Sequence, residues 1–238
     1  MKATRWMAAV GAVLAAAMTA AGAEAEGTAA AETAKAGSWV AVGPKIGTLG
    51  YGGEATVRVV SEYLNARVGF NMFAYDREID MDEATVNADL NWQTIPILLD
   101  AHPFGGGFRV SAGIVLNDNG IDLAAVPNLP IELNGVTYQP EDFVTLTGRV
   151  GFDETSYYVG IGYGNAVAGG RVHFSCDFGV MFHGEPAVEL NVEPSAALPP
   201  AVADQLRSDV ESERAEFEED LSEFAFYPVI SMGFTVNF

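Results

Sequence analysis

The segment RVHFSCDF, residues 171–178, holds the residue types in this chain that are most suited to chemistry. His173, Ser175 and Asp177 follow one another at every second position. On a β-strand such residues share one face, and a histidine beside a serine can activate the hydroxyl for acyl transfer. A histidine and a serine also meet on one strand face easily by chance. We therefore expect no catalysis here, and a hydrolase built on His173 and Ser175 is the alternative.

Isolated charged residues recur on the polar faces of other alternating segments. They are Glu54, Arg58, Arg67, Asp89, Arg109, Arg149, Arg171, Asp177, Glu189 and Glu193, with Lys45 at a similar position. If these faces line the narrow lumen of a small barrel, the charges have to pair, because an unpaired buried charge is costly. We predict a salt-bridged network that fills the lumen. The alternative is a narrow polar channel for small solutes, in which the arginines and acids set the selectivity.

The acidic connection 194–223 predicts an amphipathic helix. Pro199 and Pro200 can open a helix. A narrow apolar stripe follows, formed by Val202, Leu206, Val210, Phe217, Leu221 and Phe224. We expect this stripe to lie on the barrel rim with the acids in water, and inward folding that gates the lumen is another alternative.

Hard oxygen ligands within this helix form a weak candidate for a divalent-cation site. They are Glu216, Glu218, Glu219 and Asp220. A cation held there could bridge to the phosphates of lipopolysaccharide. The spacing matches no EF-hand loop, so we expect no metal and no cofactor.

Strict alternation of apolar and polar residues recurs from Trp39 to the end of the chain and predicts β-strands with one apolar face. In the last segment Ile230, Met232, Phe234 and Val236 alternate with small or polar residues. The polar faces carry glycine, serine, asparagine and isolated charges, whereas a water-exposed face would carry abundant lysine and glutamate. This pattern is typical of a transmembrane antiparallel up-and-down β-barrel whose apolar side chains face lipid.

The N-terminal stretch MKATRWMAAVGAVLAAAMTAAGAEA places two basic residues before a largely apolar run that ends in small residues at cleavage-site spacing. It predicts a secretory signal peptide over 1–23, followed by a flexible segment over 24–37 and the barrel over 38–238. Cys176 is the only cysteine, so no intrachain disulfide can form. The net charge of −20 argues against nucleic-acid partners, because phosphate contacts need lysine and arginine.

Connection lengths predict ten strands, with eight as the alternative. Short turns are expected at 61–64, 102–107, 153–156 and 183–186, and longer connections at 76–84, 118–143 and 194–223. This alternation is typical of short periplasmic turns and long external loops. His102 and His183 fall in the short turns, where we predict ordinary surface positions.

Several stretches resemble a family of small bacterial outer-membrane β-barrel proteins that is broadly similar to OmpA/OmpW-type barrels. They are DAHPFGGGFRVSAGIVLNDNGID (100–122), YVGIGYGNAV (158–167), CDFGVMFHGEP (176–186) and DLSEFAFYPVISMGF (220–234). The resemblance implies an outer-membrane barrel and implies no reaction. His173 and Ser175 also resemble the catalytic pair of barrel lipid A deacylases, but position 187, near where those enzymes place a supporting glutamate, is alanine.

The sequence as a whole predicts an exported, non-enzymatic outer-membrane β-barrel, either structural and adhesive or a narrow channel for small solutes. A lipid A-modifying hydrolase is the alternative. The expected partners are outer-membrane lipids, lipopolysaccharide and the barrel assembly machinery, which would recognise the terminal Phe238. We expect a monomer.

Overall fold

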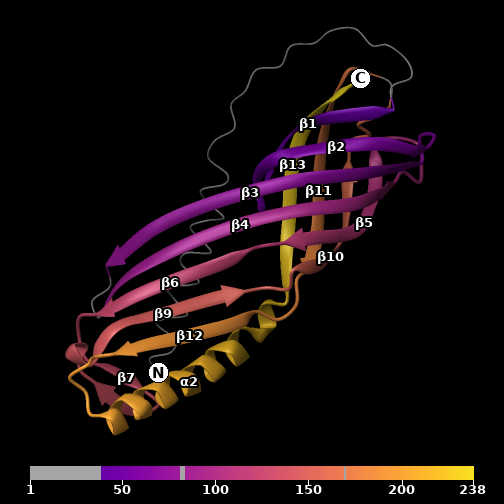
Figure 1. Ribbon diagram of the computed structural model, residues 1–238. Helices are drawn as coiled ribbons and strands as arrows, with labels where there is room; N and C mark the ends of the chain where they lie inside the picture. Colours follow the sequence, from indigo (N-terminus) through magenta and orange to yellow (C-terminus); the bar gives the residue numbers. More distant parts are fainter. Residues whose placement is uncertain (1–38, 81–83, 169) are drawn as a thin grey trace.

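The computed structural model describes residues 39–80, 84–168 and 170–238, which form antiparallel β-structure with one long helix (Figure 1). The strands are β1 (Val40–Gly47), β2 (Gly50–Val60), β3 (Leu64–Asp80), β4 (Ala84–Ala101), β5 (Phe108–Asn117), β6 (Gly120–Pro127), β7 (Ile131–Leu133), β8 (Val136–Tyr138), β9 (Phe143–Gly151), β10 (Thr155–Tyr163), β11 (Val172–Phe182), β12 (Ala187–Pro194) and β13 (Phe226–Asn237). The helices are α2 (Pro200–Leu221) and the short 3₁₀ turns η1 (Pro140–Asp142) and η2 (Ser222–Phe224). Within the described ranges, no helix is long and apolar enough to cross a membrane. The predicted signal peptide and the segment 24–37 lie outside the described residues.

A closed antiparallel ring is the centre of the fold. Its order is β4-β3-β2-β1-β13-β11-β10-β5, and β5 pairs back onto β4. The first and last strands of the chain meet in this ring, with Val42 opposite Val236. The predicted β-barrel is therefore confirmed, and its ring has the eight strands of the alternative count.

Three further strands continue the barrel wall on one side. β3 and β4 are 17 and 18 residues long and run well past the ring. The later half of β4, from Thr94, pairs with β5, and its earlier half, up to Asn91, pairs with β6. β9 then pairs with β6, and β12 pairs with β9. We call this part the extension: β3 from Phe73, β4 up to Trp92, β6, β9, β12, the β7–β8 hairpin and α2.

Three short segments join strands that run in the same direction. The first lies at the start of the long connection predicted over 118–143, which in the structure contains β6, β7 and β8. β5 and β6 are both antiparallel to β4, so residues 118–119 join two parts of one path. By the same reasoning 152–154 joins β9 to β10 and 183–186 joins β11 to β12. The hairpins predicted at 153–156 and 183–186 are therefore wrong. Hairpins do occur at 61–63 and 102–107, at the end of the barrel away from the extension, which we call the turn end.

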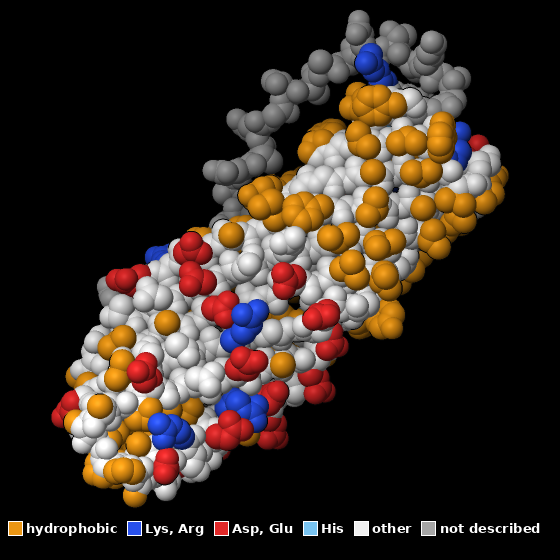
Figure 2. Space-filling model, in the orientation of Figure 1, with side chains coloured by type: hydrophobic (Ala, Val, Ile, Leu, Met, Phe, Trp, Pro, Cys, Tyr) orange, Lys and Arg blue, Asp and Glu red, His pale blue; other side chains and the backbone are white. Residues whose placement is uncertain are grey.

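Odd-numbered residues of β4 point outward along the whole strand. These outer residues are apolar in the barrel half and polar in the extension half. In the barrel half Ile97 and Leu99 are exposed on the outer surface, Leu99 by 54 %. In the extension half the outer positions are polar, with Asp89 and Asn91 exposed, and the inner position of Trp92 is buried. Figure 2 shows the result, with hydrophobic side chains over the barrel and acids with some arginines over the extension.

Helix α2 covers the extension and confirms the helix predicted in 194–223. Pro200 occupies its first turn, where the missing N–H costs nothing. Leu206 and Val210 pack with the β7–β8 hairpin, and Leu221 packs with Trp92 at the junction with the barrel. The middle of the apolar stripe, from Leu206 to Leu221, thus lies against the sheet of the extension, whereas the sequence had placed the stripe on the barrel rim. Its end residues Val202 and Phe224 are exposed.

Candidate functional site: an ion-pair cluster in the barrel lumen

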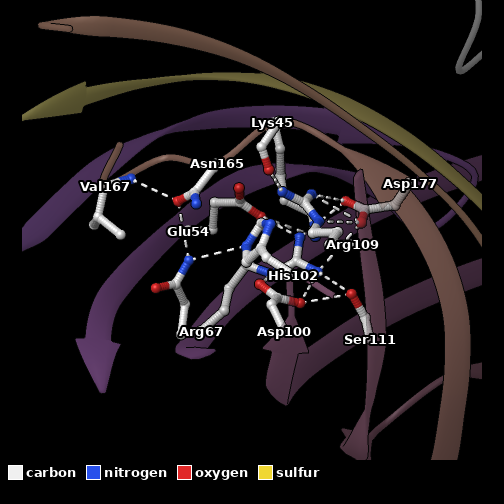
Figure 3. A network of polar contacts seen from close by, with 12 residues as sticks. Lys45, Glu54, Arg67, Asp100, His102, Arg109, Ser111, Asn165, Val167 and Asp177 are labelled. Carbon is white, nitrogen blue, oxygen red and sulfur yellow. Dashed lines mark hydrogen bonds and ion pairs between the residues drawn. The ribbon is translucent and has the colours of Figure 1, made fainter. Parts of the chain in front are cut away.

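Charged side chains from β1, β2, β3, β4, β5 and β11 meet inside the barrel (Figure 3). They are Lys45, Glu54, Arg67, Asp100, Arg109 and Asp177. Each belongs to the inward face of its strand, because alternate residues of a strand point to opposite sides of the wall. The three cations balance the three acids, so the cluster carries no net charge.

Arg67 is the centre of the cluster and is only 4 % exposed. Its Nη1 lies 2.8 Å from Asp177 Oδ2 and 3.2 Å from Glu54 Oε2. Its Nε lies 3.0 Å from Asp100 Oδ2. Ser111 supports this carboxylate by donating from Oγ to Asp100 Oδ1 at 2.6 Å. One guanidinium therefore ties acids from β2, β4 and β11 together, a task suited to its planar set of donors.

Arg109 completes the cluster on the other side of Asp177. Its Nη2 donates to both oxygens of Asp177, at 2.8 and 2.9 Å. Its Nη1 donates to the carbonyl of Gly164 at 2.6 Å. Lys45 Nζ lies 3.6 Å from Glu54 Oε2. Each charge therefore has an opposite charge within reach, as burial requires.

The β10–β11 connection folds into the barrel at the turn end. Asn165, Ala166 and Val167 are buried, and the last two pack on Ala41 of β1. Asn65 Nδ2 donates to Asn165 Oδ1 at 3.1 Å, and the Arg58 guanidinium donates to the Val167 carbonyl. This plug, residues 164–168, was not predicted. Its signal in the sequence is the run of small residues that begins at Gly164, whose φ of +117° suits glycine.

Both turn histidines are buried, contrary to the expected surface positions. His102 is 1 % exposed, its Nδ1 lies 3.0 Å from the Gly106 carbonyl and its Nε2 lies 3.1 Å from Asn65 Nδ2. Burial lowers the pKa of His102, because an imidazolium is poorly solvated there. His183 lies at the β11–β12 joint, where its ring meets Phe152 edge-on at a centroid distance of 4.4 Å. Burial likewise lowers the pKa of His183.

An apolar layer fills the lumen between the cluster and the extension. It consists of Leu49, Leu98, Val115, Tyr158, Met181 and Val229. The Tyr158 ring lies over Gly160 and Gly179, where any Cβ would overlap it. The described lumen is thus occupied in succession by the plug, the ion-pair cluster and this layer.

Half of the predicted charge network joins this cluster or lies beside it. Glu54, Arg67, Arg109 and Asp177 are in the cluster, and Arg58 faces the plug. The sequence included Lys45 as a further member, and it missed Asp100, which stands on the inward face of β4.

The other predicted members face water. Asp89, Arg149, Glu189 and Glu193 are exposed on the outer face of the extension, and Arg171 is exposed before β11. The prediction failed because it assumed that polar faces turn inward everywhere, whereas the extension has the opposite arrangement. Asp76, Asp89, Asp122, Arg149 and Glu189 stand directly opposite one another across β3, β4, β6, β9 and β12. Within this row Arg149 Nη1 lies 3.4 Å from Asp122 Oδ1.

The candidate hydrolase residues do not form a catalytic arrangement. His173 Nε2 lies 3.0 Å from the Gly170 carbonyl, and among the described hydrogen bonds none joins His173 to Ser175. Asp177 is held by the two arginines of the cluster. Both candidate side chains are on the inward face of β11.

The four acids of α2 that were the weak metal candidate, Glu216, Glu218, Glu219 and Asp220, are not placed together as ligands of one ion. Glu218 pairs with Arg214 one turn earlier. Across the described part of the chain, no group of three or more His, Cys, Asp or Glu is placed to hold a metal ion.

Two solved structures that are similar to this chain come from Acinetobacter baumannii. CarO matches with a TM-score of 0.53 and 20 % identity, covering 84 % of this chain and 98 % of its own. The chain shares its fold with CarO. CarO2 matches with a TM-score of 0.53 and 16 % identity, covering 87 % of this chain and 100 % of its own. No protein-family model and no curated protein matches the chain, so the resemblance to OmpA/OmpW-type barrels stays a prediction.

Proposed function

We propose that the protein is a non-enzymatic outer-membrane β-barrel, closed to solutes, that holds its acidic extension outside the membrane. The observation that carries this proposal is the inversion along β4. The barrel half exposes Ile97 and Leu99, and the extension half exposes Asp89 and Asn91. An outer surface that is apolar around the barrel and polar beyond it suits a strand that leaves lipid for water.

The filled lumen favours a structural role over a channel. Arg67, Asp100, Arg109 and Asp177 are all nearly inaccessible, and they are locked together by charge-assisted hydrogen bonds. Opening a path would separate buried opposite charges, which is expensive in a low-dielectric lumen. The plug adds a second barrier at the turn end, which we assign to the periplasm because its hairpins are short.

Planar-bilayer conductance of the refolded mature chain tests the closed barrel. We expect no steady channel current from the full mature chain or from a variant that lacks 195–222, while a porin refolded in parallel conducts. Steady current from the full mature chain would overturn the closed barrel and restore the solute channel. Current that arises only in the shortened variant would assign α2 as a gate.

Lipid A analysis tests the non-enzymatic part of the proposal. Mass spectra of lipid A should be the same from cells with and without the protein. Loss of an acyl chain that depends on the protein and disappears in Ser175→Ala would establish the hydrolase instead.

A further inference from the structure

The sheet of the extension has one covered edge and one open edge. The edge strand β12 packs against α2. At the opposite edge β2 pairs with β3 only as far as Met72, which faces Tyr51. β3 continues to Asp80 with β4 on its other side. In the described part of the chain, no strand pairs with the open edge of β3 over residues 73–78 (Figure 1).

In the described part of the chain, this edge has only one of the devices by which proteins prevent strand pairing, the charged side chains of Asp76, Arg77 and Glu78. Other such devices include proline, bulges, lysines and a covering loop or helix. The segment FAYDRE, residues 73–78, contains no proline, no glycine and no lysine. Its register against β4 is regular, from Asn71 opposite Thr94 to Asp80 opposite Thr85. The edge is therefore a regular row of backbone N–H and C=O groups with which another strand can pair.

The two faces of this segment differ in chemistry. Asp76 and Glu78 are exposed on the outer face, and Asp76 stands in the same row as Asp89. On the inner face Phe73 and Tyr75 are half-buried and stacked, with ring centroids 6.4 Å apart. Arg77 follows on the same inner face, where it is exposed and donates to Tyr75 Oη. A strand added here would need basic residues on its outer face and, on its inner face, apolar residues beside Phe73 and Tyr75.

A second copy of the chain does not meet this requirement. Antiparallel self-pairing that keeps the faces aligned, centred on Arg77, sets Asp76 of each copy opposite Glu78 of the other. Like charges directly opposite one another destabilise a sheet. In other aligned registers the second copy still offers no basic residue on this outer face, where Asp76 and Glu78 are its only charged residues within 72–78. Charge complementarity therefore favours a basic partner over a second copy.

We propose that the open edge of β3 binds an extended segment of another protein as an added strand, with basic residues against Asp76 and Glu78 and apolar residues against Phe73 and Tyr75. Main-chain hydrogen bonds supply the affinity in this mode of binding, and the alternating side chains supply the specificity.

Peptide binding to the refolded full mature chain tests the backbone part of the proposal. The probe is a fluorescent peptide of alternating lysine and valine, followed by anisotropy. N-methylation of alternate amides in one phase should weaken binding about tenfold, because it removes hydrogen bonds to β3, and methylation in the other phase should be tolerated. Equal binding of both methylated peptides and the parent would overturn the proposal, since charge alone would explain that result.

Charge reversal tests the position of the bound strand. Asp76→Lys and Glu78→Lys should each weaken binding roughly threefold to tenfold, because each removes a cross-strand ion pair and adds a repulsion. Asp89→Lys is the matched control, since it lies on the same outer face one strand further in. An equal loss in Asp89→Lys would overturn the proposal. The proposal would also be overturned if the protein without peptide formed a dimer and Asp76→Lys abolished that dimer.

Discussion

At the scale of single residues, the neutralisation of the buried acids in the lumen depends on Arg67. Its guanidinium lies within 3.2 Å of Glu54 and closer still to Asp100 and Asp177. Lys45 and Arg109 alone cannot neutralise these acids. Among the described ion pairs of the barrel, Arg67 is the one cation that contacts three carboxylates.

Arg67→Met should therefore destabilise the barrel by roughly 3–5 kcal/mol, because it leaves acids buried without a counter-charge. Urea unfolding of the refolded protein in detergent measures the change. Arg149→Met is the control, because Arg149 and its partner Asp122 are both about half exposed, and a surface ion pair is worth about 1 kcal/mol or less. Equal losses in the two variants would contradict the buried cluster.

Asp209 joins α2 to the β7–β8 hairpin. It is 1 % exposed and accepts hydrogen bonds from Tyr138 Oη at 2.6 Å, Gln205 Nε2 at 2.8 Å and Asn134 Nδ2 at 3.2 Å. The bond from Tyr138 is the main cause that lowers the pKa of Asp209. Burial, aided by the same bond, raises the pKa of Tyr138.

Low pH should weaken the contact between α2 and the β7–β8 hairpin. A carboxyl whose pKa is lower in the folded state stabilises that state fully above its ordinary pKa, and this stabilisation is lost as the pH falls through the lowered value. Amide-hydrogen exchange in α2, corrected for intrinsic rates, should thus lose protection on acidification. Asp209→Asn should remove most of this acid dependence, whereas Asp204→Asn, at an exposed position, should retain it. Identical acid profiles in all three proteins would rule Asp209 out.

Elements were easier to predict than the direction in which they face. Alternation located most of the strands, but it missed β6, β7 and β8, which lie within the long connection predicted over 118–143. The two prolines and the apolar stripe located the helix 200–221. Alternation could not tell which face is inside, because the same parity is polar-inward in the barrel and apolar-inward in the extension. Asp89 and Glu189 were assigned to the lumen for this reason. The preferred count of ten strands was wrong for the ring, which has the alternative count of eight. Asp153 and Gly184 look like turn residues but stand at joints between strands that run in the same direction.

The outer face of the extension carries acids in direct opposition. Asp76, Asp89 and Asp122 are cross-strand neighbours on β3, β4 and β6. Asp89→Asn should raise the unfolding free energy of the extension by up to about 1 kcal/mol, because it removes like-charge pairs. The gain, measured by urea unfolding, should shrink in high salt.

Glu189→Gln is the control for this change. Glu189 stands opposite Arg149 and not opposite an acid. Its substitution should lower stability slightly or leave it unchanged. If Glu189→Gln raised the unfolding free energy as much as Asp89→Asn, the total negative charge would matter and the direct cross-strand pairing of acids would not.

At the scale of the whole molecule, the apolar belt of the barrel fixes its proposed depth in the membrane. Ile97→Arg should cost roughly 2–4 kcal/mol in lipid vesicles, the range for arginine on the lipid face of a barrel. Asn91→Arg, on the same strand face in the extension, should cost little. Unfolding free energies in vesicles and in detergent compare the two. A similar cost for both variants would place the membrane boundary elsewhere.

The continuity of β3 and β4 has a mechanical consequence. The two strands stay paired from Leu64 opposite Ala101 in the barrel to Asp80 opposite Thr85 at the tip, with no linker between. The extension therefore cannot swing on a hinge. A pull on its tip along the strands loads the ladder of hydrogen bonds in shear, so that they resist together and are not peeled apart in turn. In the proposed membrane setting, a sideways push on the extension tilts the barrel with it, and the lipid around the barrel resists the rotation.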